Sequence, residues 1–217
     1  MTELPSSNAP TSDRIRERAA RAGLDLNVGE LDQLTRYYLL LERWNRTMNL
    51  TSLPLDNCPD RTLDRLIIEP LLSASQLDDT PLHWFDFGSG GGSPAVPLKV
   101  MRPNARLTMV EAKGRKGAFL REVVGSLALS STDVLSSRIE ALVGTGLRGM
   151  ADLVTVRAVR IDQRLLDSSA AVLRLGGRLI VYRSSIPLYY NDLRFESVAE
   201  LALPAVGSGL SVLERAH

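Results

Sequence analysis

Glycines follow directly after a short apolar run in the stretch WFDFGSGGGSPAVPL, residues 84–98. Gly88, Gly90 and Gly92 alternate with other small residues, and Ser93-Pro94 then suits the N-cap and first position of a helix. Glycine is used where a backbone turns sharply or comes close to another group. A strand, a glycine loop and a helix in this order predict a ligand site at the carboxyl edge of a parallel sheet.

The residues around this loop restrict the ligand. A Walker loop requires Lys followed by Ser or Thr after its last glycine, so Ser93-Pro94 excludes that class of nucleotide site. A dinucleotide fingerprint fits in spacing alone, because no small apolar residue closes it. Asp86 lies two residues before Gly88, where a carboxylate can reach the ammonium of S-adenosylmethionine or stabilise the turn. Glu111 ends the next apolar run and can accept both hydroxyls of a ribose. Since NAD also has a ribose, Glu111 predicts an adenosine ligand of either kind.

The composition is typical of a soluble globular protein. A chain of 217 residues, 44% hydrophobic and 24% charged, predicts one domain with additional helices. The apolar runs are too short for a membrane helix, and the N-terminus lacks a secretory pattern, so we expect no membrane partner. Cys58 is the only cysteine, which excludes an intrachain disulfide and makes a cytoplasmic location the expectation. His83 and His217 are the only histidines, so we expect no metal site. Nothing in the sequence indicates an oligomer.

Positive charge is concentrated in one segment, although the net charge is only +1. The stretch EAKGRKGAFLRE places Lys113, Arg115, Lys116 and Arg121 close together. Such a cluster forms either a solvated helix face or a surface that contacts phosphates. Charge alone leaves both interpretations open.

The first part of the chain has helical patterns only. Residues 1–12 are rich in Ser, Thr and Pro, which predicts disorder. A helix over residues 13–22 would be capped by its first residue, an aspartate, and would end at a glycine. Apolar residues at helical spacing over 31–44 predict a second helix with one buried face. A third is predicted over 62–75, with Pro70 as a kink or break.

From about residue 80, short apolar runs alternate with helical segments. The predicted strands are His83–Phe87, Arg106–Glu111, Thr132–Ser136, Leu153–Arg157 and Arg178–Tyr182, followed by a hairpin of Phe195–Leu203 and Leu210–Arg215. The predicted helices are Pro94–Met101, Arg115–Leu127, Ile139–Leu142 and Ile161–Leu173. This alternation predicts an α/β domain over 80–217, with a mainly parallel, doubly wound sheet. Residues 13–79 form a helical extension that joins it in one compact unit.

Several motifs together resemble the RsmG (GidB) family of small-subunit rRNA guanine-N7 methyltransferases. They are WNRTMNLTSL (44–53), DFGSGGGSPAVPLKVMRP (86–103), EAKGRKGAFLREV (111–123), SRIEAL (137–142) and VRAV (156–159). The resemblance implies a class I, Rossmann-like methyltransferase fold with S-adenosylmethionine as cofactor. It also implies 16S rRNA, naked or in the assembled small ribosomal subunit, as the partner.

The resemblance also implies roles for particular residues. On the cofactor side these are Asp86, Gly88, Gly90 and Ser93 near the methionine and ribose, Glu111 at the ribose, and Ile139 with Glu140 at the adenine. Arg157 matches an arginine beside cofactor and target base, although a strand-end salt bridge is the simpler interpretation. Arg183 would help Arg157 to bind the guanine edge or a phosphate. The expected RNA contacts are Arg65, Lys113, Arg115, Lys116 and Arg121.

The chemistry of guanine N7 agrees with the residues present. This nitrogen carries a lone pair and no proton, so its methylation requires no general base. The chain departs from the family pattern at Arg65-Leu66-Ile67-Ile68-Glu69-Pro70, where the family usually has Arg-His, two apolar residues and Asp-Ser. Two alternatives therefore stay open: a methyltransferase of the same fold that acts on another RNA or a small molecule, and a non-catalytic relative that binds RNA or ribosomes.

Overall fold

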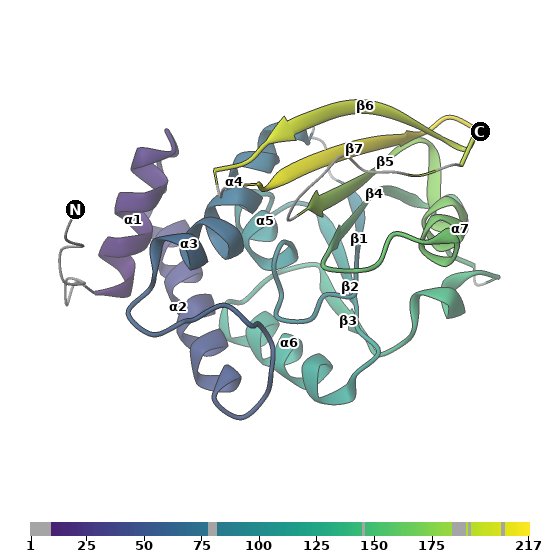
Figure 1. The fold of residues 1–217 in the computed structure, drawn as a ribbon. Coiled ribbons are helices and arrows are strands. Elements are labelled where there is room, and N and C mark those ends of the chain that lie inside the picture. Colours follow the sequence, from purple (N-terminus) through teal and green to yellow (C-terminus); the bar gives the residue numbers. More distant parts are fainter. Residues whose placement is uncertain (1–9, 78–81, 145, 184–189, 191, 205–206) are drawn as a thin grey trace.

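A seven-stranded sheet forms the centre of the molecule (Figure 1). The computed structural model describes residues 10–217 except 78–81, 145, 184–189, 191 and 205–206. The strands are β1 (His83–Phe87), β2 (Arg106–Val110), β3 (Thr132–Leu135), β4 (Ala151–Arg157), β5 (Leu173–Arg183), β6 (Phe195–Ala202) and β7 (Gly209–Arg215). Their order is β3-β2-β1-β4-β5-β7-β6; β7 pairs antiparallel with both β5 and β6, and the other pairs are parallel. This confirms the predicted mainly parallel sheet, and its strand order reverses between β1 and β4, where α/β sheets bind ligands.

Helices cover both faces of this sheet. They are α1 (Thr11–Arg21), α2 (Val28–Asn45), α3 (Asp60–Leu63), a π-helical turn (Asp64–Ile68), α4 (Glu69–Ser73), α5 (Ala95–Met101), α6 (Gly114–Ser126) and α7 (Gln163–Val172). Two 3₁₀ turns, Ala74–Gln76 and Ile139–Leu142, complete the described helical elements. Local signals begin two of the helices: Asn27 and Glu30 form a capping box before α2, and Asp162 caps α7.

The alternation of side chains along the strands builds two hydrophobic cores. On β1, Trp84 faces the core that also contains residues of α1, α2, α5 and α6, whereas Phe85 and Phe87 face the core formed with α7. Figure 1 shows α1 and α2 on one side of the sheet and α7 on the other. The first core contains Ile15 and Leu34 together with sheet residues, so the helical extension and the sheet share one core.

Two of the predicted N-terminal segments differ from the helices observed. The α1 helix begins at Thr11, inside the segment predicted to be disordered, and Asp13 lies in its first turn and does not cap it. Residues 1–9 lie outside the described residues. Residues 60–73 form one continuous helical segment, because a π turn before Pro70 avoids the predicted break. We call this segment the wall helix.

Two further boundaries are corrected near the sheet. Ser93 is not an N-cap: α5 begins at Ala95 after Pro94, and no side chain caps it. The fifth strand begins at Leu173 and not at Arg178, because Leu173 already pairs with Ala151 before a bulge shifts the register. The predicted helix at 139–142 is a 3₁₀ turn.

Two kinds of feature are absent from the described residues. No described helix is both long and apolar enough to cross a membrane. No group of three or more His, Cys, Asp or Glu side chains in the described ranges could hold a metal ion.

An ion pair fixes α1 to the wall helix. Arg18 donates from Nε and Nη2 to the Asp64 carboxylate at 2.7–3.0 Å, and the Asp64 side chain is only 10% exposed. We expect Arg18→Ala to lower the free energy of unfolding by about 1.5–3 kcal/mol, because a nearly buried carboxylate loses its charged donors. Urea denaturation at pH 7 measures this change.

Arg21→Ala is the matched control on the same helix. The ion pair of Arg21 with Glu17 is more than half exposed on both sides, so its loss should cost less than about 1 kcal/mol. Similar losses for the two variants would show that the Arg18 pair does not anchor α1.

Candidate functional site

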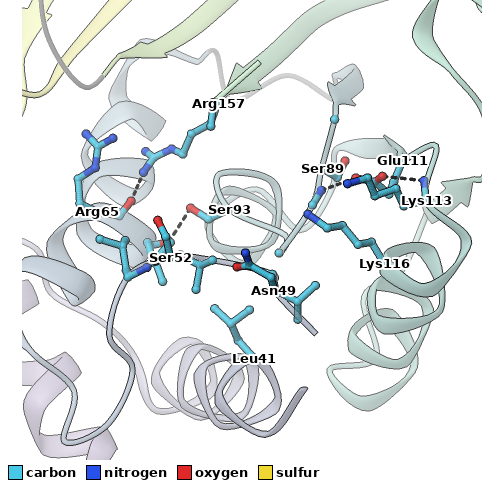
Figure 2. A pocket seen from close by; sticks show the side chains of 18 of the residues that line it. Leu41, Asn49, Ser52, Arg65, Ser89, Ser93, Glu111, Lys113, Lys116 and Arg157 are labelled. Atoms are coloured by element: carbon cyan, nitrogen blue, oxygen red, sulfur yellow. Dashed lines mark hydrogen bonds between the residues drawn. The ribbon is translucent and has the colours of Figure 1, made fainter. Parts of the chain in front are cut away.

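A pocket of about 620 Å³ lies at the carboxyl edge of the sheet, beside the reversal of strand order. Three connections from the sheet line it: the loop after β1, the segment after β2, and the end of β4. The helical extension supplies the remaining wall. The lining residues are Leu41, Asn49–Leu53, Arg61, Arg65, Leu66, Gly88–Gly91, Ser93, Glu111, Lys113, Lys116, Arg157 and Ala158. Figure 2 shows the arginines on one side, Glu111 and the lysines on the other, and Ser93 and Asn49 between them.

Protein packing accounts for most of the glycines in the loop. A Cβ on Gly88 would lie 2.7 Å from Val159 Cγ2, and one on Gly92 would lie 3.0 Å from Val96 Cγ2. Gly91 lies against Leu41 in the same way, at 3.3 Å. A Cβ on Gly90 would lie 3.6 Å from the Gly88 carbonyl oxygen and 3.9 Å from Lys116 Nζ, which are ordinary van der Waals distances. Gly90 is therefore the least crowded of these glycines, and its φ of +51° is the reason that a glycine is favoured there.

Backbone N–H groups of the loop are already bonded within the protein. Gly88 and Ser89 donate to the Val110 carbonyl, Gly92 donates to the Ser89 carbonyl, and Gly90 donates to the Glu111 carboxylate. The pyrophosphate of a dinucleotide requires free N–H groups at such a loop. These four N–H groups already have acceptors within the protein, which disfavours NAD.

Glu111 lies where the sequence predicts, at the end of β2. Its Oε2 accepts from the Gly90 N–H at 3.0 Å and its Oε1 accepts from the Lys113 N–H at 2.8 Å. A carboxylate has about four acceptor positions, so both oxygens can still accept a hydroxyl. The two backbone bonds hold the side chain in place for the predicted ribose contact.

Asp86 is buried behind the glycine loop at the end of β1. Trp84 Nε1 donates to the Thr155 hydroxyl at 2.9 Å, and this hydroxyl donates to Asp86 Oδ1 at 2.5 Å. The second oxygen, Oδ2, is buried without a hydrogen-bond partner among the described residues. Burial raises the pKa of Asp86 to about 6, although the bond from Thr155 opposes the rise. Asp86 is not among the lining residues, so its contact with the cofactor ammonium stays a prediction.

Arg157 is held at the pocket wall by a buried carboxylate. Its Nη2 lies 3.1 Å from Glu69 Oε2, and its Nη1 donates to the Arg65 carbonyl. The Arg65 guanidinium lies 3.5 Å from the other oxygen of Glu69 and also donates to the Arg183 carbonyl at 3.2 Å. The guanidinium of Arg157 lies over the Tyr182 ring, 4.5 Å from its centroid. Burial lowers the pKa of Arg157. The strand-end salt bridge is therefore present, and Arg157 still lines the pocket.

The predicted basic cluster lies on α6 and on the residue before it, and two of its four members reach the pocket. Lys113 and Lys116 line it, and Lys116 Nζ lies 3.9 Å from the position that a Cβ on Gly90 would occupy. Arg115 is exposed on α6 outside the lining. Arg121 is exposed as well, and its Nη2 donates to the Ser136 hydroxyl at 2.6 Å.

The structure does not bring three other predicted residues to this pocket. Ile139 is half-buried against the core formed with α7, and Glu140 is exposed beside it. Arg183 forms an ion pair with Glu200 on β6. The roles of these residues at the adenine and at the target base stay predictions.

Sequence reasoning missed the part of the pocket that the helical extension supplies. Asn49–Leu53 and Arg61 were not predicted as site residues, and both line the pocket. The Asn45 side chain holds this segment, because its Oδ1 accepts from the N–H groups of Leu50 and Thr51 at 2.9 and 3.0 Å. The motif WNRTMNLTSL was the available signal, since it brings polar residues together after a helix end.

The site fits S-adenosylmethionine better than a dinucleotide. The oxygens of Glu111 suit ribose hydroxyls, and Gly90 is the least crowded glycine of the loop. Asp86 lies buried behind the loop, outside the lining, with an unpartnered oxygen of the kind that an ammonium group would bind. None of the described lining residues is a histidine or a cysteine.

The raised pKa of Asp86 makes stability depend on pH in a defined direction. Its folded pKa of about 6 lies above the ordinary 3.8, so between these pH values the folded state binds a proton that the unfolded chain has lost. The free energy of unfolding therefore falls as pH rises from 4 to 6. In the Asp86→Asn variant this decrease should be smaller by about 2–3 kcal/mol, at about 1.4 kcal/mol per pKa unit, because asparagine does not titrate. Urea unfolding of the cofactor-free protein at pH 4, 5, 6 and 7 measures it, and parallel curves for both proteins would contradict the expectation.

Comparisons with known proteins point to one family. The family model GidB, rRNA small subunit methyltransferase G, matches residues 30–198. The ribosomal RNA small subunit methyltransferase G of Chloroflexus aggregans is 35% identical over 199 residues, which cover 90% of this chain and 79% of that protein. The enzyme of the same name from Neisseria meningitidis serogroup A is 34% identical over 202 residues, covering 89% of this chain and 92% of its own.

Solved methyltransferase structures share the fold. Mitomycin 7-O-methyltransferase MmcR matches with a TM-score of 0.59 at 16% identity, over 96% of this chain and 69% of that one. The pyocyanin biosynthetic protein PhzM matches with a TM-score of 0.59 at 14% identity, over 91% and 76%. With the strand order, these matches establish the class I methyltransferase fold. The chain belongs to the rRNA small subunit methyltransferase G family, whose members methylate 16S rRNA with S-adenosylmethionine.

Proposed function

We propose that this enzyme methylates N7 of a guanine in 16S rRNA. The observation that carries the proposal is that the described lining residues offer no carboxylate, histidine or cysteine free to accept a proton from the substrate. Glu111 is the one carboxylate among the described lining residues, and in this proposal the acceptor positions left by its two backbone bonds are taken by the ribose hydroxyls of the cofactor. An exocyclic amine or a hydroxyl must lose a proton when it is methylated, whereas guanine N7 has none to lose. A pocket without an available base therefore suits N7.

The cofactor side of the pocket would be formed by residues after β1 and β2. When bound, S-adenosylmethionine supplies an electrophilic methyl group on a sulfonium. Glu111 would hold the ribose, Asp86 the ammonium, and Gly90, the least crowded glycine of the loop, would lie close to the cofactor. Ile139 and Glu140 would frame the adenine from the 3₁₀ turn after β3.

Catalysis by this chain would consist mainly of positioning. Holding two reactants in line contributes about 7–11 kcal/mol to lowering a barrier, without proton transfer. The wall helix is suited to this task, because hydrogen bonds from Ser93 in the glycine loop and from Arg157 at the end of β4 join it to the sheet. Arg157, which lines the pocket, would face the guanine edge or a neighbouring phosphate. The predicted help from Arg183 would require its side chain to leave its ion pair with Glu200.

The RNA side would use the cations on both sides of the pocket. The helical extension contributes Arg61 and Arg65, and the sheet side contributes Lys113 and Lys116. Glu111 is the one negatively charged residue among the described lining residues, so positive charge predominates. Such a charge distribution attracts the phosphates on either side of a target nucleotide. The substrate in this proposal is the assembled small subunit or its naked 16S rRNA, and the cytoplasm, which contains both, is the site of action.

Methyl transfer to defined substrates tests this proposal. Labelled S-adenosylmethionine is supplied with small subunits, and separately with naked 16S rRNA, from a strain that lacks the family enzyme. The nucleosides are then identified by mass spectrometry and the modified position is mapped. A single 7-methylguanosine supports the proposal, whereas label on another atom or another base contradicts it.

The two lysines at the pocket should contribute to the salt dependence of RNA binding. We expect the double variant K113Q/K116Q to reduce the slope of log K against log salt by about 1.4, at about 0.7 per phosphate contact with a single strand. Binding to small subunits between 50 and 200 mM salt, followed by fluorescence anisotropy, measures the slope.

Arg16→Gln provides the control for this measurement. Arg16 is an exposed cation on α1, paired with Asp13 and absent from the pocket lining. The Arg16→Gln variant should have the same slope of log K against log salt as the wild type. A double lysine variant with the wild-type slope would mean that the lysines do not contact phosphates.

A further inference from the structure

The wall helix contains a π turn directly before a proline. In an α-helix, the carbonyls of Arg65 and Leu66 would accept from the N–H groups of residues 69 and 70. The Glu69 N–H donates to the Asp64 carbonyl instead, and Pro70 has no N–H. Two consecutive carbonyls of the wall helix therefore lose their regular donors.

Two side chains from the edge of the sheet donate to these carbonyls (Figure 2). The Ser93 hydroxyl donates to the Leu66 carbonyl at 2.9 Å. Arg157 Nη1 donates to the Arg65 carbonyl. Ser93 belongs to the loop after β1 and Arg157 ends β4, so both bonds join the sheet to the wall helix.

The Ser93 hydroxyl is used for this bond and not for local helix capping. Although Ser93 precedes α5, no side chain caps that helix. Ser93 is half-buried and lines the pocket together with Leu66. Its hydroxyl donates to the Leu66 carbonyl in place of the backbone N–H that residue 70 lacks because it is a proline.

We propose that Ser93 is a positioning residue that replaces the N–H missing at Pro70 and so holds the glycine loop against the wall helix. The loop carries Gly90, which is bonded to Glu111, and the wall helix carries Arg65. The bond from Ser93 therefore fixes the distance between the cofactor side and the RNA side of the pocket. The proposal rests on the cofactor site and is independent of which rRNA atom receives the methyl group.

A double-mutant cycle between positions 93 and 70 tests the proposal. The measurement is the Kd of S-adenosylhomocysteine, the demethylated cofactor, by calorimetry at a temperature at which circular dichroism shows every variant folded. The variants S93T and S93V are close in shape and differ in the hydroxyl. We expect S93V to bind about tenfold more weakly than S93T, which corresponds to about 1.4 kcal/mol.

Pro70→Ala should remove this difference. It restores an N–H that points at the Leu66 carbonyl, so the ratio between S93V and S93T should fall below about twofold in the P70A background. Pro97→Ala is the matched control, because Pro97 is also a buried helical proline whose restored N–H would face the carbonyl of residue 93. The tenfold ratio should persist in the P97A background.

Two results would overturn the proposal. The same ratio with Pro70 in place and in the P70A background would mean that Ser93 acts through a direct contact with the ligand. Equal affinities of S93T and S93V with Pro70 in place would mean that the hydroxyl has no positioning role, and this comparison decides the matter even if P70A does not fold.

Discussion

Glu69 carries a carboxylate with no exposed surface, between the guanidinium groups of Arg65 and Arg157. A buried carboxylate is tolerated only where cations or donors surround it, and removing one partner costs about 3–5 kcal/mol. Arg65 belongs to the helical extension and Arg157 to β4, so this single charge holds two parts of the chain together. The Tyr182 ring beneath Arg157 completes the arrangement. The position of the whole arginine side of the pocket depends on this buried charge.

The helical extension also shapes the cofactor side. The Tyr37 hydroxyl on α2 donates to the Gly91 carbonyl at 2.7 Å, and a Cβ on Gly92 would lie 3.2 Å from the Tyr37 ring. Leu41 contacts the loop one turn further along α2. The conformation of the glycine loop is therefore determined by α2 as well as by the strand before it. The helical extension therefore shapes the glycine-loop side of the pocket as well as its arginine side.

The fold could be predicted from the sequence because strands buried on both faces give short, continuous apolar runs. The same logic located Glu111 and Arg157, since side chains that follow parallel strands meet at one edge of the sheet. It failed at Ser93, which has the residue type of an N-cap but donates to a carbonyl distant in sequence. It also missed Arg61 and the segment 49–53. Their proximity to the loop results from packing of the extension on the sheet, and no local periodicity encodes that packing.

The order in which the chain is synthesised adds a constraint to this architecture. Arg65 and Arg157 are separated by 92 residues, and N-terminal segments fold first as a chain leaves the ribosome. Until β4 has emerged, Glu69 has only one of its two arginines and the pocket lacks a wall. The arginine side of the pocket therefore cannot form before residue 157 has been synthesised, although the residues of the helical extension that line it come much earlier in the chain.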